Sequence, residues 1–595
     1  MAGTGARDPW QVPFYLGAAA FAASLLVLLA AIVGARTDDA PRQVAAGGGD
    51  NNAPAEAELT SESQLPTLSY SGTLPAGLEG LGLVAAALGK KSDVSFEPGD
   101  GAIELTHRYF VPVAAMGAGV DALTGAQLAA IFAGTTTDWA QVGGTGGRIR
   151  FAAAGQGPDL ALQALFAGTT PAAGLLFLTY DELRAAMTMN SGIIAFVPLG
   201  EVRPSMMAIA VDGIDPVRGR GDVAAWPFAQ RVSFRALSNR GKELGARVRE
   251  VVEADRPAVT RVVATGDILQ SRCALTAIRA TGDWGAALRG PVGEYLAAAD
   301  LTLGSLDGSI QDIHAPNGCI STTNLSSPPE VMEALTLAGF DGVTVATNHV
   351  FDCTQYCGNR AFLQTLERLA AAGIKVVGGG KNLEEALAPA IFEVNAIRFG
   401  VLGFDDIAAE DLEAEADVPG TAPLDDSYDD EQASIPREPA FFQSADKLHL
   451  TRMTQRIQLL KTQVDVVIVQ VQSGTEDTHA PSPRSIKALR AAADAGAGLV
   501  VGNQAHWVQA VEMRGNAFIA YALGNFVFDQ RWTPEHTQGY LLEATFHGKQ
   551  LIAVRFVPYQ IENRYKPTFV TGAARSKILG DVMDASAKLP SGVNR

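Results

Sequence analysis

The chain is predicted to be an α/β protein with two folded domains behind an N-terminal hydrophobic segment. Short runs rich in Val, Ile and Leu alternate with stretches of helical spacing, the pattern of strands buried between helices. A length of 595 residues exceeds what one hydrophobic core usually organises. The composition, with 47% hydrophobic and 18% charged residues, is that of a folded chain.

The formal net charge of −18 bears on the partners of the protein. An acidic surface repels the phosphates of nucleic acids. We therefore expect no nucleic-acid partner.

An uncharged apolar stretch, Pro13 to Ala35, follows a short tail at residues 1–12 and ends at Arg36. Roughly 20 apolar residues suffice to cross a bilayer core. Residues 13–36 are therefore predicted to be a single transmembrane signal anchor in the cell membrane, with most of the chain extracytoplasmic. The alternative is a cleaved signal peptide, for which Val33-Gly34-Ala35 offers a small-residue cleavage site.

Composition shifts divide the rest of the chain. Residues 37–66 are rich in Ala, Gly, Asp, Asn and Glu without apolar periodicity, which is typical of a flexible linker. Residues 67–255 and 258–572 are predicted to be the two folded domains, and residues 573–595 a C-terminal tail.

In the first domain, strands and helices are expected to alternate, as in a layered α/β unit. The expected strands are Phe110–Ala114, Phe151–Ala154 and Ser191–Val197, and the expected helices are Gly125–Phe132, with Thr124 as N-cap, and Leu160–Phe166.

The segment Leu123–Gly134, with Thr137-Asp138-Trp139 and Gly192–Val197, resembles PstS-type phosphate-binding periplasmic proteins. The resemblance implies a partial periplasmic-binding-protein-like domain that grips phosphate with hydroxyls and backbone amides at helix N-termini. Ser69, Ser71 and Thr73 are candidates for the first binding loop. The second loop, Ala154-Gly-Gln-Gly-Pro158, lacks the Arg and the Ser-Gly-Thr of that family. A ligand-binding or sensor module and a structural or docking module both remain open.

Six apolar runs in residues 258–572 are followed closely by polar residues that can bind a metal. They are Val262–Thr265 with Asp267, Leu301–Leu306 with Asp307, Val343–Thr347 with Asn348 and His349, Val466–Val471 with Gln472, Leu499–Gly502 with Asn503, Gln504 and His506, and Phe518–Leu523 with Asn525. Helices are expected between them at Glu330–Ala338, Ala361–Ala372 and Arg484–Ala495. One such residue alone is usually a turn or a cap. Because loops after strands gather at one sheet edge, the recurrence predicts one shared site.

Four cysteines allow three disulfide pairings. We predict the pairs Cys273–Cys319 and Cys353–Cys357, since local pairing is geometrically easiest; free buried thiols are the alternative. The chain has no Cys-x-x-Cys spacing, which argues against a zinc site built from these residues.

The second domain resembles the CapA family of bacterial capsule-synthesis proteins. The resemblance is carried by Thr265–Leu269, Ala299–Gly308, Ala338–Asp352, Ala495–Gly502 and Tyr521–Asp529. It implies a calcineurin-like, metallophosphatase-type α-β-β-α sandwich linked to poly-γ-glutamate or a related anionic cell-surface polymer. The implied partners are that polymer or its synthesis machinery.

Departures from the family pattern concern the metal. Ser305-Leu306-Asp307 stands for Asn-Leu-Glu, Thr347 for the first Asn of Asn-Asn-His, and Gln472 and Gln504 for two imidazoles. Amides bind Zn, Fe or Mn more weakly than imidazole does. The retained candidate ligands for a divalent metal (Mn, Mg, Fe or Zn) are Asp267, Asp307, Asn348 and His506.

The resemblance implies hydrolysis or transfer at an amide or phosphoester bond. His349 is expected to be the general acid and Asp352 its orienting partner. The candidate substrate-binding residues are Gln472, Asn503, Gln504, Asn525 and Arg531. A catalytically degenerate scaffold that binds a polymer or an anion is the alternative, favoured by the two lost imidazoles. The acidic stretch Asp406–Arg437 is expected to be an exposed insertion or a lid.

Overall fold

A computed structural model of the chain describes residues 68–72, 81–87, 90–97, 102–154, 176–189, 192–253, 258–313, 318–319, 324–353, 357–408, 410–426 and 445–590. The predicted anchor at 13–36, the linker at 37–66 and the helix Leu160–Phe166 lie outside these residues. Among the helices that are described, none has the length and hydrophobicity needed to cross a bilayer. The unit Thr67–Arg595 is compact.

The N-terminal domain is built on a nine-stranded sheet of order β2-β1-β3-β11-β4-β8-β6-β7, with β9 paired to β4. Its strands are β1 (Leu68–Ser71), β2 (Leu83–Ala85), β3 (Val94–Ser95), β4 (Ile103–Ala115), β6 (Arg150–Ala154), β7 (Leu176–Leu178), β8 (Ile193–Pro198), β9 (Met206–Ala208) and β11 (Ala229–Ala236), and β5 (Ala122–Leu123) pairs with β10 (Ala210–Val211). Its helices are α2 (Gly125–Phe132), α4 (Tyr180–Met189) and α5 (Asn239–Glu253).

Local sequence explains where α2 begins. The Thr124 hydroxyl accepts a hydrogen bond from the Gln127 amide, and the Gln127 side chain accepts one from the Thr124 amide. This reciprocal capping satisfies two donors that a helix start leaves free. The predicted N-cap is confirmed, and the three expected strands of this domain fall on β4, β6 and β8.

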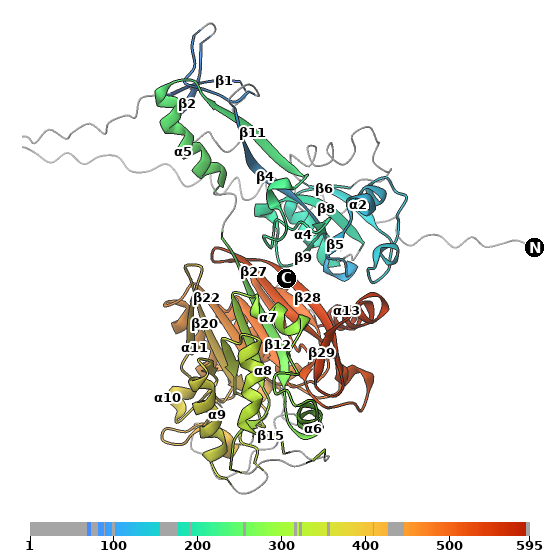
Figure 1. Ribbon diagram of the computed structural model, residues 1–595, viewed down its shortest axis with the longest axis vertical. Helices are drawn as coiled ribbons and strands as arrows, with labels where there is room; N and C mark the ends of the chain where they lie inside the picture. The colour runs from blue at the N-terminus through green and yellow to red at the C-terminus, as the bar shows by residue number, and fades with distance from the viewer. Residues whose placement is uncertain are drawn as a thin grey trace, which may run out of the picture. The chain divides into compact units, whose positions relative to one another are not determined.

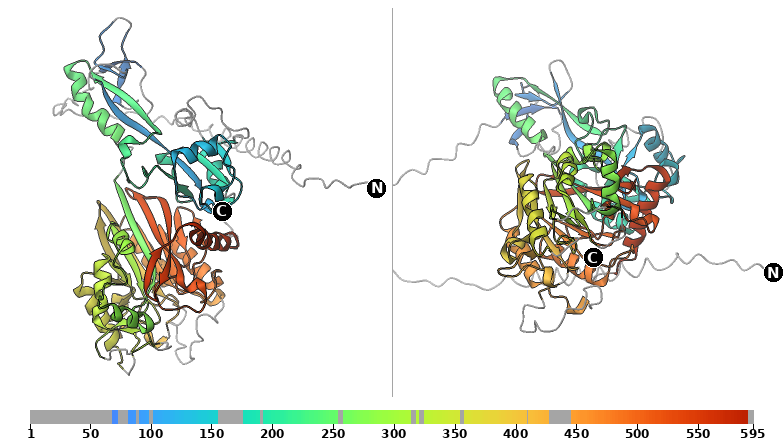
Figure 2. Two further views of the ribbon diagram at one scale, coloured as in Figure 1. Left: turned by 45° about the vertical axis from the view of Figure 1, so that its right-hand side comes forward. Right: turned by 60° about the horizontal axis from the view of Figure 1, so that its bottom comes forward.

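The C-terminal domain contains two large sheets. The first, of order β17-β16-β13-β12-β27-β28-β29 with β26 beside β12, comprises β12 (Val259–Ile268), β13 (Leu301–Leu306), β16 (Gly342–Thr344), β17 (Lys375–Val377), β26 (Asn525–Val527), β27 (Gln538–His547), β28 (Gln550–Glu562) and β29 (Lys566–Phe569). The second, of order β19-β20-β22-β23-β25-β24, comprises β19 (Ala390–Val394), β20 (Ile397–Asp405), β22 (Val466–Gln472), β23 (Leu499–Asn503), β24 (Val511–Arg514) and β25 (Ala517–Ala520). Figure 2 shows the green β12 beside the long orange and red strands of its sheet.

The two sheets pack face to face, and successive side chains along each strand point alternately between the sheets and toward the outer face. Val262 of β12 lies in the apolar cluster between the sheets, with Phe399 and Ile468 of the second sheet, whereas Val263 lies in the cluster on the outer face. Side chains two residues apart share a face of a strand.

Helices cover both outer faces (Figure 1). They are α6 (Arg272–Thr281), α7 (Pro291–Ala297), α8 (Met332–Leu337) and α9 (Arg360–Ala371) on the first sheet, and α10 (Leu383–Ala386), α11 (Thr451–Lys461) and α12 (Pro483–Ala495) on the second. The three helices expected in this domain correspond to α8, α9 and α12, and the layer order is helix, sheet, sheet, helix.

Two expectations about loops and ends are wrong. Residues Gly572–Ala587 of the predicted tail form α13, whose Leu579 and Val582 are buried in the cluster between the sheets. The acidic stretch Asp406–Arg437 is not exposed throughout. Asp406 and Asp425 are buried, and both bind Arg484. Residues 427–444 of the insertion lie outside the described part.

Both predicted disulfides, Cys273–Cys319 and Cys353–Cys357, are present in the structure. The first joins the start of α6 to the segment after β14 (Ser309–Ile310), and the second closes a short loop ahead of α9.

Buried charges connect the two domains. Glu543 of β27 is fully buried and pairs with Arg218 and Arg220 of the N-terminal domain, 3.3 and 2.6 Å away, and with Arg261 of β12. Asp121 of the N-terminal domain pairs with Arg555 of β28. Burial alone would raise the pKa of Glu543, but these arginines hold it below its ordinary value.

Candidate functional site

Asp267 lies at the carboxyl end of β12 and is almost completely buried. One oxygen accepts a hydrogen bond from the Ser305 hydroxyl at 3.0 Å, and the other accepts one from the Gln504 amide at 3.4 Å. His506 Nδ1 lies 3.7 Å from the same carboxylate. Burial, followed by the charge of Asp307, raises the pKa of Asp267 well above its ordinary value.

A glycine allows β12 and β26 to meet beside this carboxylate. A Cβ atom on Gly266 would lie 1.7 Å from the carbonyl oxygen of Gly524, which accepts the Asp267 amide. Only glycine permits such an approach of two backbones. The Gly-Asp and Gly-Asn motifs therefore bring Asp267 and Asn525 into register.

Asp307 follows β13 directly, and both of its carboxylate oxygens are buried without a hydrogen-bond partner among the described residues. Burial raises its pKa, and the charge of His349 opposes that effect. Buried polar atoms are normally satisfied, so this carboxylate is a candidate ligand-binding group.

His349 and Asp352 form a pair on the turn after β16. His349 Nδ1 lies 2.7 Å from Asp352 Oδ2, which also accepts the Leu325 amide at 2.6 Å. Burial lowers the pKa of His349, but the Asp352 hydrogen bond and the nearby carboxylates raise it to about 9. The ring is therefore protonated at neutral pH, as a general acid requires.

Three polar residues stand side by side where strands of the second sheet end. Asp405 pairs in register with Gln472, and Gln472 with Asn503. Asp405 Oδ2, Gln472 Oε1 and both polar atoms of the Asn503 amide are buried without a partner in the described structure. Burial raises the pKa of Asp405 to about 7, and the charges of Asp406 and Asp307 add to this effect.

The two glutamines that replace imidazoles bind each other. Gln472 Nε2 donates to Gln504 Oε1 at 2.7 Å, and Gln504 Nε2 donates to Glu476 at 3.2 Å. Gln504 and His506 both have positive φ, 94° and 57°, so the loop after β23 is strained. Such outliers in non-glycine residues concentrate at functional sites.

His506 is held by Asn525. The Asn525 amide nitrogen donates to Gln530 and to the His536 carbonyl, so its oxygen faces His506 Nδ1 at 2.9 Å. That arrangement assigns the proton to Nδ1 and leaves the lone pair on Nε2. Burial lowers the pKa of His506 to about 3, so the ring is neutral and suited to binding a metal.

The predicted metal ligands are mostly oxygen donors. Asp267 and Asp307 supply carboxylates, and the oxygens of Asn348 and Gln472 are buried without a partner among the described residues. The described part of the chain contains no group of three or more His, Cys, Asp or Glu that can hold a metal. Oxygen-rich sets of this kind suit Mg²⁺ or Mn²⁺ with water ligands more than Zn²⁺.

One predicted site residue stands apart. Arg531 is exposed, and the hydrogen bonds and ion pairs described for the site do not include it. Hydrogen bonds, one close ion pair and strand pairing link Asp267, Gln472, Asn503, Gln504, His506 and Asn525, and a separate hydrogen bond links His349 and Asp352. Among the described residues, no side-chain hydrogen bond or ion pair joins Asp307 or the Asn348 oxygen to them.

Sequence reasoning missed Asp405 and Arg272. Asp405 follows the apolar run Phe399–Phe404, the same signal that marked the other strands, but we assigned its neighbours to an insertion. Arg272 begins α6, pairs with Asp529, and adds positive charge near Asp307, His349 and His506. No pattern in the sequence marks it.

The C-terminal domain is therefore an α/β domain of two packed sheets. Its candidate site consists mainly of carboxylate and amide side chains and lies where the strands end. Residues 261–530 match the family described as bacterial capsule synthesis protein PGA_cap, and the C-terminal domain belongs to this CapA family.

Two curated relatives are similar to part of this chain. Capsule biosynthesis protein CapA of Bacillus anthracis is 28% identical over 244 residues, which cover 41% of this chain and 54% of the relative. PGA biosynthesis protein CapA of Bacillus subtilis is 29% identical over 211 residues, which cover 35% and 48%. The chain spans about half the length of the curated relatives it matches.

Solved structures show only distant similarity. PstS from Borrelia burgdorferi is 13% identical with a TM-score of 0.27, over 32% of this chain and 96% of that one. A phosphate transport receptor from Vibrio cholerae is 17% identical with a TM-score of 0.23, over 27% and 74%. TM-scores this low carry no argument about the fold or the ligand of the N-terminal domain.

Proposed function

We propose that this protein takes part in the synthesis, export or anchoring of poly-γ-glutamate or a related anionic capsule polymer. In this proposal its C-terminal domain, a calcineurin-like sandwich, is a metal-assisted hydrolase or transferase. Membership of the CapA family and the helix–sheet–sheet–helix layering support it. The observation that carries the catalytic part is Asp307, whose two buried oxygens have no partner within the described residues.

Each site residue has a role in this proposal. Asp267, Asp307, Asn348 and His506 would hold a divalent cation, which when bound polarises a carbonyl or phosphoryl oxygen. Protonated His349, oriented by Asp352, donates a proton to the leaving group. Asn503 and Gln472 hydrogen-bond the polar groups of the substrate.

The test consists of two measurements. Elemental analysis gives the metal content, and activity assays give the rates of hydrolysis of γ-glutamyl peptides and phosphoesters. We expect Asp307→Asn to lower bound Mn²⁺ and activity together, and His349→Gln to lower activity by 10²-fold or more at unchanged metal content, an order-of-magnitude figure for a general acid. Asp417→Asn, at an exposed position, is the control. Equal metal content and equal turnover in wild type and Asp307→Asn would rule out the catalytic proposal.

The alternative is a scaffold that binds polymer without turnover. The hydrogen bonds among Gln472, Gln504 and Glu476 favour it. They engage the Gln472 amide nitrogen and both polar atoms of the Gln504 amide, at positions where the family has imidazoles. Polymer binding by a protein that shows no turnover with any of the added Mn²⁺, Mg²⁺, Fe²⁺ or Zn²⁺ ions would support this alternative.

Membrane attachment is a separate part of the proposal. We expect residues 13–36 to hold the protein in the cell membrane with its domains outside. Deletion of residues 1–36 should move the protein from the membrane fraction to the soluble fraction after cell lysis. Retention in the membrane fraction would contradict this expectation.

A further inference from the structure

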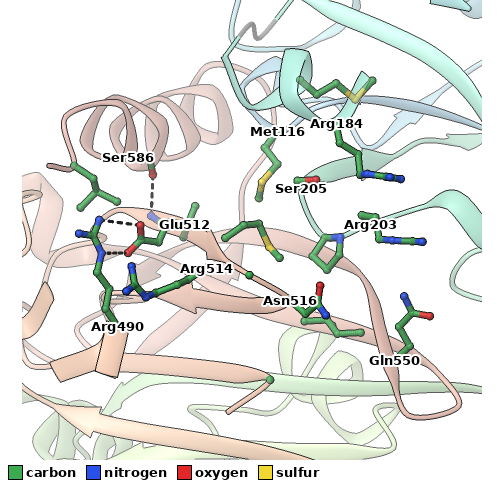
Figure 3. A pocket seen from close by; sticks show the side chains of 18 of the residues that line it. Met116, Arg184, Arg203, Ser205, Arg490, Glu512, Arg514, Asn516, Gln550 and Ser586 are labelled. Atoms are coloured by element: carbon green, nitrogen blue, oxygen red, sulfur yellow. Dashed lines mark hydrogen bonds and ion pairs between the residues drawn. The ribbon is translucent and has the colours of Figure 1, made fainter. Parts of the chain in front are cut away.

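The groove drawn in Figure 3 has a volume of about 1680 Å³, and charged side chains at its wall pair with carboxylates. Arg490 binds Glu512 through two hydrogen bonds, and Arg514 binds Asp494 through two more. Paired charges of opposite sign largely cancel, so these pairs do not select a ligand by its charge. The strand ends of the second sheet differ in this respect.

Three polar residues each end a strand of the second sheet. Asp405 is the last residue of β20, Gln472 of β22 and Asn503 of β23, and the three pair in register. Side chains in register on neighbouring strands share a face of the sheet and lie about 5 Å apart. We call these three residues the strand-end row.

The strand-end row faces the first sheet. Val401, Ile468 and Val501 precede its three residues by two or four positions and lie in the apolar cluster between the sheets. Phe404 and Val471, one position before the row, lie in the cluster on the outer face. Because alternate side chains share a face, the row continues the inner face of the sheet at the point where apolar packing ends.

The row presents buried polar atoms that the described residues leave unpaired. Asp405, Gln472 and Asn503 are 0%, 2% and 2% exposed. Asp405 Oδ1 accepts the amides of Ile407 and Ala408, but Oδ2 has no partner in the described part of the chain. The same holds there for Gln472 Oε1 and for both polar atoms of the Asn503 amide. Because buried polar atoms are normally satisfied, the row is a candidate binding site.

A chain of hydrogen bonds determines which atom of Gln472 is available. Gln504 Nε2 donates to the Glu476 carboxylate at 3.2 Å, so Gln504 Oε1 faces Gln472. Gln472 Nε2 donates to that oxygen at 2.7 Å, which leaves Gln472 Oε1 for a ligand. Glu476 is exposed, so the same chain of hydrogen bonds links the buried row to the surface.

The available groups define the chemistry of the ligand. Over the described residues, they are three acceptor oxygens and one NH₂ group, that of Asn503. A phosphate or carboxylate offers only acceptors, which the three oxygens repel. A primary ammonium group offers three N–H donors and a positive charge, which match these oxygens and the carboxylate of Asp405. An oxygen next to that ammonium would accept from the Asn503 NH₂ group.

Neighbouring charges also favour a cationic ligand. Arg484 is one cation bound to two carboxylates, those of Asp406 and Asp425. Burial raises the pKa of Asp405, and the charges of Asp406 and Asp307 raise it further, so its ionised form lacks a compensating cation. One carboxylate with two amides is also a weak ligand set for a transition metal.

We propose that the strand-end row binds the amino-terminal ammonium group of a peptide substrate. The inference rests on the proposed function, in which Gln472 and Asn503 contact the substrate. The ammonium donates to Asp405 Oδ2, Gln472 Oε1 and Asn503 Oδ1, and the neighbouring carbonyl or carboxylate oxygen accepts from Asn503 Nδ2. Asp405 is then a specificity-determining residue that directs the site to one end of a chain.

The test compares two peptides that differ only in the ammonium group, γ-linked triglutamate and its N-acetyl derivative. Calorimetry measures the binding of each to the full-length protein. We expect the wild type to bind the free amino terminus about tenfold or more tightly, as for a hydrogen bond to a charged group. Asp405→Asn keeps the shape of the side chain and should abolish this preference. Asp417→Asn, at an exposed position, should retain it.

A second variant separates a loss of binding from a loss of folding. Asp405→Asn combined with Asn503→Asp exchanges carboxylate and amide between the two ends of the row. Because one carboxylate again faces the ligand, this double variant should recover part of the preference that Asp405→Asn loses. A purely structural role of Asp405 predicts no recovery.

Three outcomes would overturn the proposal: no binding by the wild type, equal affinity for the two peptides, or equal losses for both peptides in Asp405→Asn. A fall in bound Mn²⁺ in Asp405→Asn would assign the row to the metal instead. The ratio of the two affinities requires no turnover. Loss of metal and activity in Asp307→Asn with an unchanged ratio, or the reverse, therefore separates failure of this inference from failure of the catalytic proposal.

Discussion

Two histidines of the candidate site have opposite protonation states for identifiable reasons. Burial disfavours the charged form of both rings, but only His349 is hydrogen-bonded to a carboxylate, that of Asp352, at 2.7 Å. His506 is bonded to a neutral amide, so its pKa falls to about 3. At neutral pH the candidate site therefore contains one protonated and one neutral imidazole ring.

We predict that Asp352→Asn lowers the pKa of His349 from about 9, because burial is then opposed only by the charge of Asp307 and no longer by the Asp352 hydrogen bond and charge. The interactions of the protonated His349 ring stabilise the folded state fully below pH 6.5, and this contribution is lost as the pH rises through 9. NMR titration of the imidazole in metal-free protein measures the change. An unaltered titration in Asp352→Asn would contradict the assignment, and Asp417→Asn is the control.

A second prediction concerns Asp405, whose pKa is raised to about 7, chiefly by burial. Between pH 4 and 7 the folded state binds more protons here than the unfolded state, so stability falls as the pH rises. In the metal-free wild type, raising the pH from 4 to 7 should lower the free energy of unfolding by on the order of 4 kcal/mol through this group. The Asp405→Asn variant should not show this decrease. Urea unfolding at pH 4 and pH 7 measures it, and equal losses in both proteins would refute it.

At the scale of elements, the site depends on how closely strands approach each other. The turn after Leu523 can pass beside β12 only because Gly266 has no side chain where it meets the Gly524 carbonyl oxygen. This contact sets the register in which Asp267 faces Asn525.

Gly266→Ala is predicted to lower the free energy of unfolding by about 3 kcal/mol, the upper range for an overpacked core. Its Cβ would overlap the Gly524 carbonyl oxygen. Gly580→Ala in α13, where no atom lies within 4 Å of the new Cβ, should instead stabilise the protein by about 0.5–1 kcal/mol. Chemical denaturation compares the two variants, and a neutral Gly266→Ala would show that the strands can separate without cost.

At the scale of the whole molecule, buried charge couples the two domains. Glu543 is fully buried among Arg218, Arg220 and Arg261, with Tyr295 donating its hydroxyl as well. Removing one member of such a group leaves the others uncompensated, which costs more than the intact group contributes.

Glu543→Ala is therefore predicted to lower stability by about 3–5 kcal/mol, as for other broken buried pairs. Because the lost contacts join the domains, calorimetry should also show the N-terminal domain unfolding at a lower temperature than the C-terminal domain. Glu393→Ala removes an exposed pair with Arg398 and should change stability by less than about 1 kcal/mol. A single unshifted transition for Glu543→Ala would refute the coupling.

Sequence alone determined several of the strands that carry the candidate site and the polar residues that follow them. Alternating apolar runs reflect local burial, so β12, β13, β16, β22 and β23 and the polar residues Asp267, Asp307 and Gln472 can be found without a structure. Local pairing also predicted both disulfides. These features depend on neighbours in the chain, which a sequence displays directly.

Only the tertiary structure decided which polar groups are satisfied and which are not. Asp406 and Asp425 resemble an exposed acidic loop in the sequence but bind Arg484 in the interior. Asp307 resembles a turn residue but is buried without a partner among the described residues. Burial and pairing depend on contacts between segments far apart in the chain, and these also set the opposite protonation of His349 and His506.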